Sequence, residues 1–211
     1  MKLIGYYNKS VYLTYLGLAS SVFGIAFALK EKFSVALSCL LFSGLCDMFD
    51  GTVAQHIPRN GPEKKFGIQI DSLCDVVCFC VFPAYLTYSM GATDILSQIC
   101  MAFFVTCGVI RLGFFNVQEE LRQAQTDEKR TSYQGLPVTT TALIFPAVIS
   151  LLTFLSVSPV RVLPVLLVLI GIAFIADVPV IKPQGKGKLV LLAVGILTFA
   201  VLLLTKGRRP A

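Results

Sequence analysis

Apolar runs, each close to the length of a membrane-crossing helix, recur along the whole of this chain. They lie at about 11–29, 34–55, 66–90, 94–115, 138–157, 160–177 and 188–205. A helix needs about 20 apolar residues to cross the hydrocarbon core of a bilayer. With 55% hydrophobic and only 14% charged residues, the chain lacks the polar groups to cover a water-facing surface. The pattern predicts one all-α, polytopic membrane bundle over residues 1–211, with a six-helix core and an extra C-terminal helix.

The placement of lysine and arginine predicts the orientation of this bundle. If the N-terminus lies in the cytoplasm, most basic residues outside the helices fall on the cytoplasmic side. The net charge of +6 suits the anionic headgroups of membrane lipids. No basic stretch with interleaved aromatic residues stands outside the apolar runs, so no nucleic-acid partner is expected.

Two pairs of aspartates interrupt the second and third runs: Asp47 with Asp50, and Asp71 with Asp75. Carboxylates at membrane depth are costly and are rarely kept there without a cation or a function. Residues three or four apart share a helix face, and a short loop between antiparallel helices would set the two acidic faces opposite each other. A pair of hard divalent cations, which prefer oxygen ligands, is the expected counter-charge.

Two other interpretations of these aspartates are weaker. They could cap helix ends near the membrane surface, but four residues at these spacings disfavour that role. They could bind a cation in transit through a transporter, but transporters usually show a repeated topology, which this chain lacks. Cys74 and Cys78 flank Asp75 and suggest zinc, yet no complete zinc ligand set is present. All seven cysteines lie in apolar runs, where they are expected to pack as small apolar residues.

Small residues accompany the aspartates. Gly51 and Ala54 follow the first pair, and Gly67 precedes the second, which lets a bulky ligand approach the backbone closely. Two cations held there could clamp a diphosphate. Arg111, within the fourth run, keeps its charge and must find an anion: either a lipid headgroup, reached by snorkelling, or a carboxylate or phosphate in the site.

The run from Asp47 to Ala54, Asp-Met-Phe-Asp-Gly-Thr-Val-Ala, followed by Gly67, Asp71 and Asp75, resembles the signature of the CDP-alcohol phosphatidyltransferases. Seven of the eight positions fixed by that signature match. The departure is Gln55, where the family usually has an arginine that helps to hold the nucleotide or phosphate. Arg59 or a lysine of the loop 55–65 is the expected substitute.

The resemblance implies a six-helix core, a homodimer and two divalent cations, Mg²⁺ or Mn²⁺. It implies that Asp47, Asp50 and Asp71 ligate the cations and that Asp75 is the general base and a further ligand. It also implies that Asp47, Gly51, Ala54 and Gly67 line the nucleotide site.

Two further segments, Arg111–Asn116 and Tyr133–Pro137, are similar to segments of bacterial and archaeal phosphatidylserine synthases. This resemblance implies CDP-diacylglycerol as donor and L-serine as acceptor, in a prokaryotic cell membrane. The orientation predicted from the basic residues places the aspartates, and so the active site, on the cytoplasmic side. Arg111 is then a candidate for binding the serine carboxylate or a lipid phosphate, and Asn116 and Gln134 are candidates for further polar contacts. The alternative acceptors are glycerol 3-phosphate and an inositol phosphate, which would need more basic side chains in the cavity.

The connections carry three further predictions. Asn60-Gly61-Pro62 predicts a turn within the loop 55–65. The first half of the polar stretch 116–135 is expected to prolong the fourth helix. Pro83, Pro146 and Pro164 lie within apolar runs and are expected to kink their helices.

Overall fold

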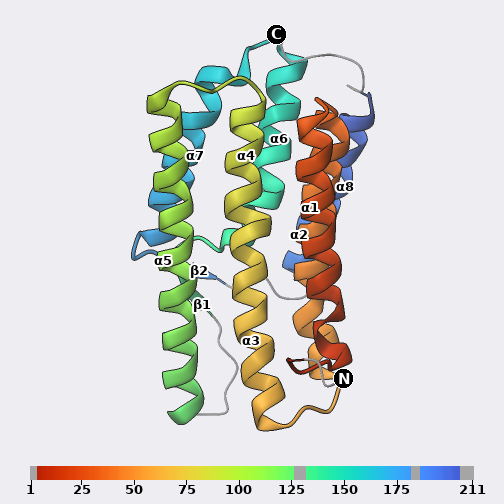
Figure 1. Ribbon diagram of the computed structural model, residues 1–211, viewed down its shortest axis with the longest axis vertical. Coiled ribbons are helices and arrows are strands. Elements are labelled where there is room, and N and C mark those ends of the chain that lie inside the picture. The colour runs from red at the N-terminus through yellow and green to blue at the C-terminus, as the bar shows by residue number, and fades with distance from the viewer. Residues whose placement is uncertain (1–3, 126–131, 182–185, 205–211) are drawn as a thin grey trace.

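The computed structural model describes residues 4–125, 132–181 and 186–204, and over these residues the chain forms an elongated bundle of helices (Figure 1). The helices are α1 (Tyr12–Leu29), α2 (Phe33–Gln55), α3 (Gly61–Asp75), α4 (Phe82–Ser89), α5 (Ile95–Gln125), α6 (Thr141–Phe154), α7 (Pro159–Ile175) and α8 (Lys186–Leu204). A π-helical segment, Val76–Val81, joins α3 to α4, and 3-10 turns at Lys9–Val11 and Val138–Thr140 precede α1 and α6. The predicted all-α polytopic bundle is confirmed.

Each predicted apolar run is largely helical over the residues that the structure describes. Among these residues, five stretches are long and apolar enough to cross a membrane: Lys9–Leu29, Phe33–Gln55, Gly61–Ser89, Ile95–Arg122 and Gly187–Leu204. The stretches Val138–Phe154 and Pro159–Ile175 are apolar but shorter. A helix of 17 residues, such as α7, rises about 26 Å, slightly less than the roughly 30 Å of a hydrocarbon core. The protein is therefore an integral membrane protein whose last two core helices are short.

Small residues let the helices approach closely. A Cβ added to Gly44 of α2 would lie 2.5 Å from the Cβ of Ala142 in α6. A Cβ at Gly108 of α5 would clash with the sulfur of Cys80. Close contact at small residues is the usual way in which membrane helices associate. The core between these helices is filled by large side chains, all fully buried: Phe79, Phe82, Phe104, Phe145 and Phe174.

The start of α3 differs from the prediction. The side chain of Asn60 accepts a hydrogen bond from the Glu63 amide, and the Glu63 carboxylate accepts one from the Asn60 amide, both at 2.9 Å. This capping box starts a helix, so Asn60-Gly61-Pro62 is a helix start and the predicted turn was wrong. The connecting loop ends at Asn60, and Lys64 and Lys65 lie on α3 rather than in the loop.

The polar stretch after α5 also holds a feature that the sequence did not indicate. Helix α5 continues to Gln125, as predicted for the first half of the stretch. Beyond it, β1 (Ser132–Gln134) pairs antiparallel with β2 (Pro179–Ile181). Gly135 follows with φ +74°, and a side chain there would clash with the carbonyl oxygen of Phe174. The connection before α6 is therefore held against the end of α7.

An irregular backbone marks the middle of the α3–α4 rod. The amide of Phe82 bonds to the carbonyl of Val77, five residues back, immediately before Pro83. Proline cannot donate to a helix ladder, and π-helical turns often mark such irregularities near functional sites. The irregular segment lies between α3 and α4, which together form one continuous rod (Figure 1).

Candidate active site

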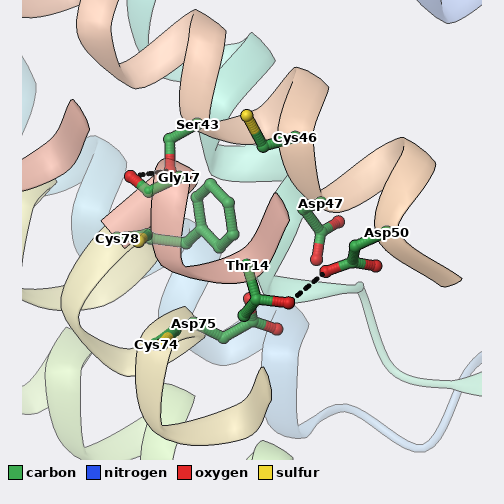
Figure 2. Close-up of a pocket in the computed structure, with 10 residues that line it drawn as sticks. Thr14, Gly17, Ser43, Cys46, Asp47, Asp50, Cys74, Asp75 and Cys78 are labelled. Atoms are coloured by element: carbon green, nitrogen blue, oxygen red, sulfur yellow. Dashed lines mark hydrogen bonds between the residues drawn. The ribbon is translucent and has the colours of Figure 1, made fainter. Parts of the chain in front are cut away.

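Four aspartates of α2 and α3, which we call the acidic cluster (Asp47, Asp50, Asp71 and Asp75), come together where α3 passes into the π-helical segment. One carboxylate oxygen from each of Asp47, Asp71 and Asp75 lies within 4.8 Å of the others. Asp50 accepts a hydrogen bond of 3.1 Å from Thr14 of α1, and it interacts electrostatically with Asp71. Figure 2 shows Asp47, Asp50 and Asp75 pointing toward one space beside Thr14. The predicted convergence of the two pairs is confirmed.

The loop between α2 and α3 is held so that the two acidic faces stay opposed. Asn8, before α1, donates a hydrogen bond of 3.2 Å to the carbonyl of Pro58 in this loop. The ring of Tyr6 packs edge-on against Phe66 of α3, with 5.5 Å between centroids. The capping box at Asn60 fixes the first turn of α3. The chain before α1 therefore stabilises the α2–α3 pair, which carries the acidic cluster.

The acidic cluster is largely shielded from solvent, which makes its charge costly. Asp50 is 9% exposed and Asp75 is 8% exposed, and Asp47 and Asp71 are half-buried. Like charges this close repel strongly where water is excluded, so cations or protons must lie among these carboxylates. Several carboxylate oxygens converging on one point are the ligands that Mg²⁺ and Mn²⁺ prefer. The donor set therefore fits hard divalent cations.

A cavity opens beside the acidic cluster. It is lined by Thr14, Gly17, Ser43, Cys46, Asp47, Asp50, Cys74, Asp75, Cys78 and Phe79. Its volume of about 10 Å³ is room for about one water molecule, far less than the roughly 300–1,000 Å³ of most small-molecule sites. A nucleotide must therefore lie in more open space next to it. The lining cysteines are free thiols.

The two glycines predicted to line the nucleotide site have different surroundings. A Cβ at Gly51 would meet no atom within 4 Å, so packing does not require glycine at that position. A Cβ at Gly67 would lie 3.7 Å from a guanidinium nitrogen of Arg59 and 3.7 Å from Val11. Ala54 is half-buried on the same face of α2 as Asp47 and Asp50. Open space therefore adjoins the acidic cluster at Gly51.

The structure also distinguishes among the cations that could replace the arginine absent at position 55. Arg59 is half-buried, and its guanidinium lies against Gly67 on α3. Lys65 makes an ion pair of 3.9 Å with Glu120, and both side chains are about 80% exposed, at 81% and 79%. Lys64 is exposed as well. Arg59 is thus the loop cation that lies beside a predicted nucleotide-binding position.

Arg111 lies inside the protein and does not snorkel to the surface. It is 7% exposed, its guanidinium carbon lies 5.1 Å from the ring centroid of Phe115, and it interacts electrostatically with Asp47. A cation over an aromatic ring is stabilised by the electron-rich ring face. Helix α5 therefore brings one buried positive charge toward the acidic cluster.

The other two acceptor candidates lie in different settings. The Asn116 side-chain oxygen accepts a hydrogen bond of 3.0 Å from Ser72, the residue after Asp71. Asn116 thus ties α5 to the acidic helix α3. Gln134 lies in β1, opposite Pro179, and is exposed. Its contact with an acceptor stays a prediction.

Sequence reasoning missed three residues of this region. Thr14 bonds to Asp50, Ser72 bonds to Asn116, and the Lys188 ammonium of α8 reaches the Met48 carbonyl of α2 at 3.4 Å. A hydroxyl inside an apolar helix is a weak signal for Thr14 and Ser72. Nothing in the sequence pairs Lys188 with α2, because 140 residues separate it from Met48.

Comparison with known proteins agrees with this geometry. The family model described as CDP-alcohol phosphatidyltransferase matches residues 8–206. The chain is similar to proteins named CDP-diacylglycerol–serine O-phosphatidyltransferase. The one from Methanocaldococcus jannaschii is 29% identical over 90% of this chain and 86% of its own length. The one from Saccharomyces cerevisiae is 36% identical over 46% of this chain and 35% of its own length. The one from Helicobacter pylori J99 is 32% identical over 60% and 52%. The matched part thus spans only a third to a half of the last two relatives.

Proposed function

We propose that this chain, which belongs to the CDP-alcohol phosphatidyltransferase family, transfers the phosphatidyl group of CDP-diacylglycerol to the hydroxyl of L-serine. The products would be phosphatidylserine and CMP. The observation that carries the proposal is the acidic cluster, in which oxygens of Asp47, Asp71 and Asp75 lie within 4.8 Å of one another. The names of the similar proteins support the choice of donor and acceptor.

Asp47, Asp50 and Asp71 would hold two divalent cations, with Asp75 as a further ligand. Bound there, Mg²⁺ or Mn²⁺ would offset the negative charge of the diphosphate and make CMP a better leaving group. Thr14, by donating to Asp50, orients one carboxylate of this set. Hydrogen bonds to a metal-binding carboxylate hold it in the orientation that the cation needs. We therefore expect loss of the Thr14 hydroxyl to lower the affinity for cations.

Asp75 is the proposed general base. It is 8% exposed and lines the cavity, so a serine hydroxyl entering that cavity would lie within its reach. As the serine oxygen forms its bond to the lipid-side phosphorus, Asp75 accepts the hydroxyl proton, and the bond from that phosphorus to the CMP oxygen breaks. A base positioned in this way contributes about 10²–10⁴-fold to the rate. Attack in one step requires no covalent enzyme intermediate.

The nucleotide would lie over Gly51 and Ala54 of α2 and Gly67 of α3. Gly51 leaves space for it, and Arg59 supplies a guanidinium beside Gly67. A guanidinium presents donors that match phosphate oxygens. We therefore assign to Arg59 the charge that the family usually places at position 55.

Arg111 is the proposed partner of the serine carboxylate. Within the described part of the chain it is the basic residue found among the buried polar side chains. A phosphorylated acceptor, such as glycerol 3-phosphate or an inositol phosphate, brings a second phosphate and would call for a cluster of such residues. One buried guanidinium near Asp47 suits an acceptor with one carboxylate.

We further propose that the acidic cluster opens on the cytoplasmic side of a prokaryotic cell membrane and that the protein works as a homodimer. The lysine and arginine bias along the chain supports this orientation. CDP-diacylglycerol would then enter sideways, with its acyl chains in the lipid and its cytidine diphosphate toward the cytoplasm.

The direct test incubates the purified protein with labelled CDP-diacylglycerol and a panel of acceptors: L-serine, glycerol 3-phosphate, an inositol phosphate and water. We expect labelled phosphatidylserine and CMP to form only with L-serine. A chelator should stop the reaction, and Mg²⁺ or Mn²⁺ should restore it. Transfer to a phosphorylated acceptor instead of serine would refute the acceptor assignment, and transfer that continues in excess chelator would refute the role of the cations.

A further inference from the structure

Lys188, in the first turn of α8, lies beside the half of α2 that carries Asp47 and Asp50. Its ammonium nitrogen donates to the carbonyl oxygen of Met48 at 3.4 Å and to the hydroxyl of Thr52 at 3.5 Å. Both distances are at the long end for hydrogen bonds. These weak contacts orient the ammonium group and leave it able to donate a stronger hydrogen bond. A lysine has three donors, and two oxygens of α2 accept from it here.

The helix geometry of α2 shows where this ammonium points. Asp47 and Gly51 are four residues apart and form one stripe. Met48 and Thr52 form the next stripe, about 100° further around the helix. Lys188 holds the second stripe and interacts electrostatically with Asp47 and Asp50. The open space over Gly51 therefore has carboxylates on one side and an ammonium on the other.

The position of Lys188 contributes little to the stability of the fold. Lysine in the first turn of a helix opposes the helix dipole, and its contacts with Met48 and Thr52 are weak. Lys188 is half-buried, so its charge is less screened than that of Lys65 on the exposed face of α3. An anion over Gly51 could accept a shorter, charge-assisted hydrogen bond from this ammonium than the two oxygens of α2 do.

We propose that Lys188 binds a phosphate oxygen of the cytidine diphosphate, on the side of the nucleotide opposite the acidic cluster. This inference rests on the proposed function and adds α8 to the helices that build the nucleotide site. As the bond between the two phosphates breaks, negative charge grows on the departing CMP phosphate, and a fixed ammonium stabilises that charge. Lys188 would thus favour both binding of the donor and departure of CMP.

The test compares Lys188→Met, which keeps the length of the side chain and removes its charge, with Lys188→Arg and with Lys65→Met as a matched control. Binding of CMP and of cytidine is measured on detergent-solubilised protein with Mn²⁺, together with the unfolding temperature without nucleotide. We expect Lys188→Met to weaken CMP binding about tenfold, as for the loss of a hydrogen bond between charged groups. Cytidine binding should not change. Lys188→Arg should recover most of the affinity for CMP, and Lys65→Met should bind like the wild type.

Kinetics give a second readout that a structural role would not produce. Lys188→Met should raise KM for CDP-diacylglycerol and lower kcat, while KM for serine stays unchanged. Equal CMP affinity in the wild type and Lys188→Met would overturn the inference. So would an effect seen only in vesicles of anionic lipid, which would assign Lys188 to lipid headgroups. If Lys188→Met does not accumulate, Lys188→Gln against Lys188→Arg gives the same comparison.

The wild-type protein separates this inference from the proposed function. If it neither binds CMP nor transfers phosphatidyl groups, the proposed function fails. If it does both and the variants behave alike, only the role of Lys188 fails. A milder variant, Thr52→Val, removes one oxygen that positions the ammonium but leaves the charge, and should weaken CMP binding by less than Lys188→Met does.

Discussion

Aspartates in two regions of the molecule are held in opposite ways. Asp94, in the turn between α4 and α5, accepts hydrogen bonds from the amide and the hydroxyl of Ser97, at 3.0 Å and 2.5 Å. It starts a helix and is exposed. In the acidic cluster, the carboxylates face one another, and Thr14 donates to Asp50 alone among them in the described structure. A structural carboxylate accepts hydrogen bonds from donors of its own helix turn. The carboxylates of a cation-binding site instead converge on one another and have few protein donors.

The largest expected effect tests this difference with the same substitution in both regions. Asp75→Asn should lower kcat by about 10²–10⁴-fold, since it removes the base, while CDP-diacylglycerol still binds. Asp94→Asn should leave kcat unchanged. Turnover is measured as serine incorporated into lipid, and binding is measured with the labelled donor. Undiminished incorporation by Asp75→Asn would refute the role of this residue.

The next largest effect concerns the substrates that Arg111 and Arg59 bind. Arg111→Ala should raise KM for serine about tenfold or more, because a charged hydrogen-bond partner of the carboxylate is lost. KM for CDP-diacylglycerol should rise much less. Arg59→Ala is the matched variant and should show the reverse pattern. Equal effects of Arg111→Ala on both constants would indicate that Arg111 binds a lipid phosphate.

Two glycines of α2 offer a similar comparison between a structural position and a position in the proposed site. Gly44 lies against Ala142, whereas Gly51 faces open space. Gly44→Ala should lower the free energy of unfolding by about 1–3 kcal/mol through overpacking. Gly51→Ala should raise it by about 0.5–1 kcal/mol, because glycine within a helix is unfavourable.

The same two substitutions should affect nucleotide binding in the opposite way: Gly51→Ala should weaken it and Gly44→Ala should not. Gly51→Ala should raise KM for CDP-diacylglycerol several-fold, since the added methyl group occupies the space proposed for the nucleotide. Gly44→Ala, measured on the fraction that remains folded, should leave this constant unchanged. A Gly51→Ala protein with wild-type KM would show that the nucleotide lies elsewhere.

Local patterns in the sequence predicted much of this molecule. The spacing of Asp47, Asp50, Asp71 and Asp75 predicted a shared site, because helix geometry alone sets which residues share a face. The start of α3 was misplaced, because Pro62 indicates either a turn or the first turn of a helix. Only the reciprocal bonds of Asn60 and Glu63 decide between them.

Contacts between distant segments could not be predicted in the same way. The pairing of β1 with β2 depends on where α7 ends, and the contact of Lys188 with α2 depends on how α8 packs. Lys188 stands beside an apolar run, where a basic residue usually forms part of a positive flank, so the sequence alone does not indicate its contact with α2. By sequence, Arg59 is one of several possible substitutes for the missing arginine, and only the position of its guanidinium beside Gly67 distinguishes it.

The smallest expected effect is that of Asp94→Ala. Ser97 holds the pKa of Asp94 below its ordinary value, mainly through the side-chain hydrogen bond. A carboxylate with a lowered pKa stabilises the fold at pH values above its unfolded-state pKa, and this contribution is lost as the pH falls through the folded-state pKa. Asp94→Ala should therefore lower the unfolding temperature slightly at neutral pH and not at low pH, where the wild type has also lost the bond. Ser97→Ala should reproduce that shift, with kcat and both KM values unchanged. A loss of turnover in Asp94→Ala as large as that in Asp75→Asn would remove the distinction between a capping carboxylate and a catalytic one.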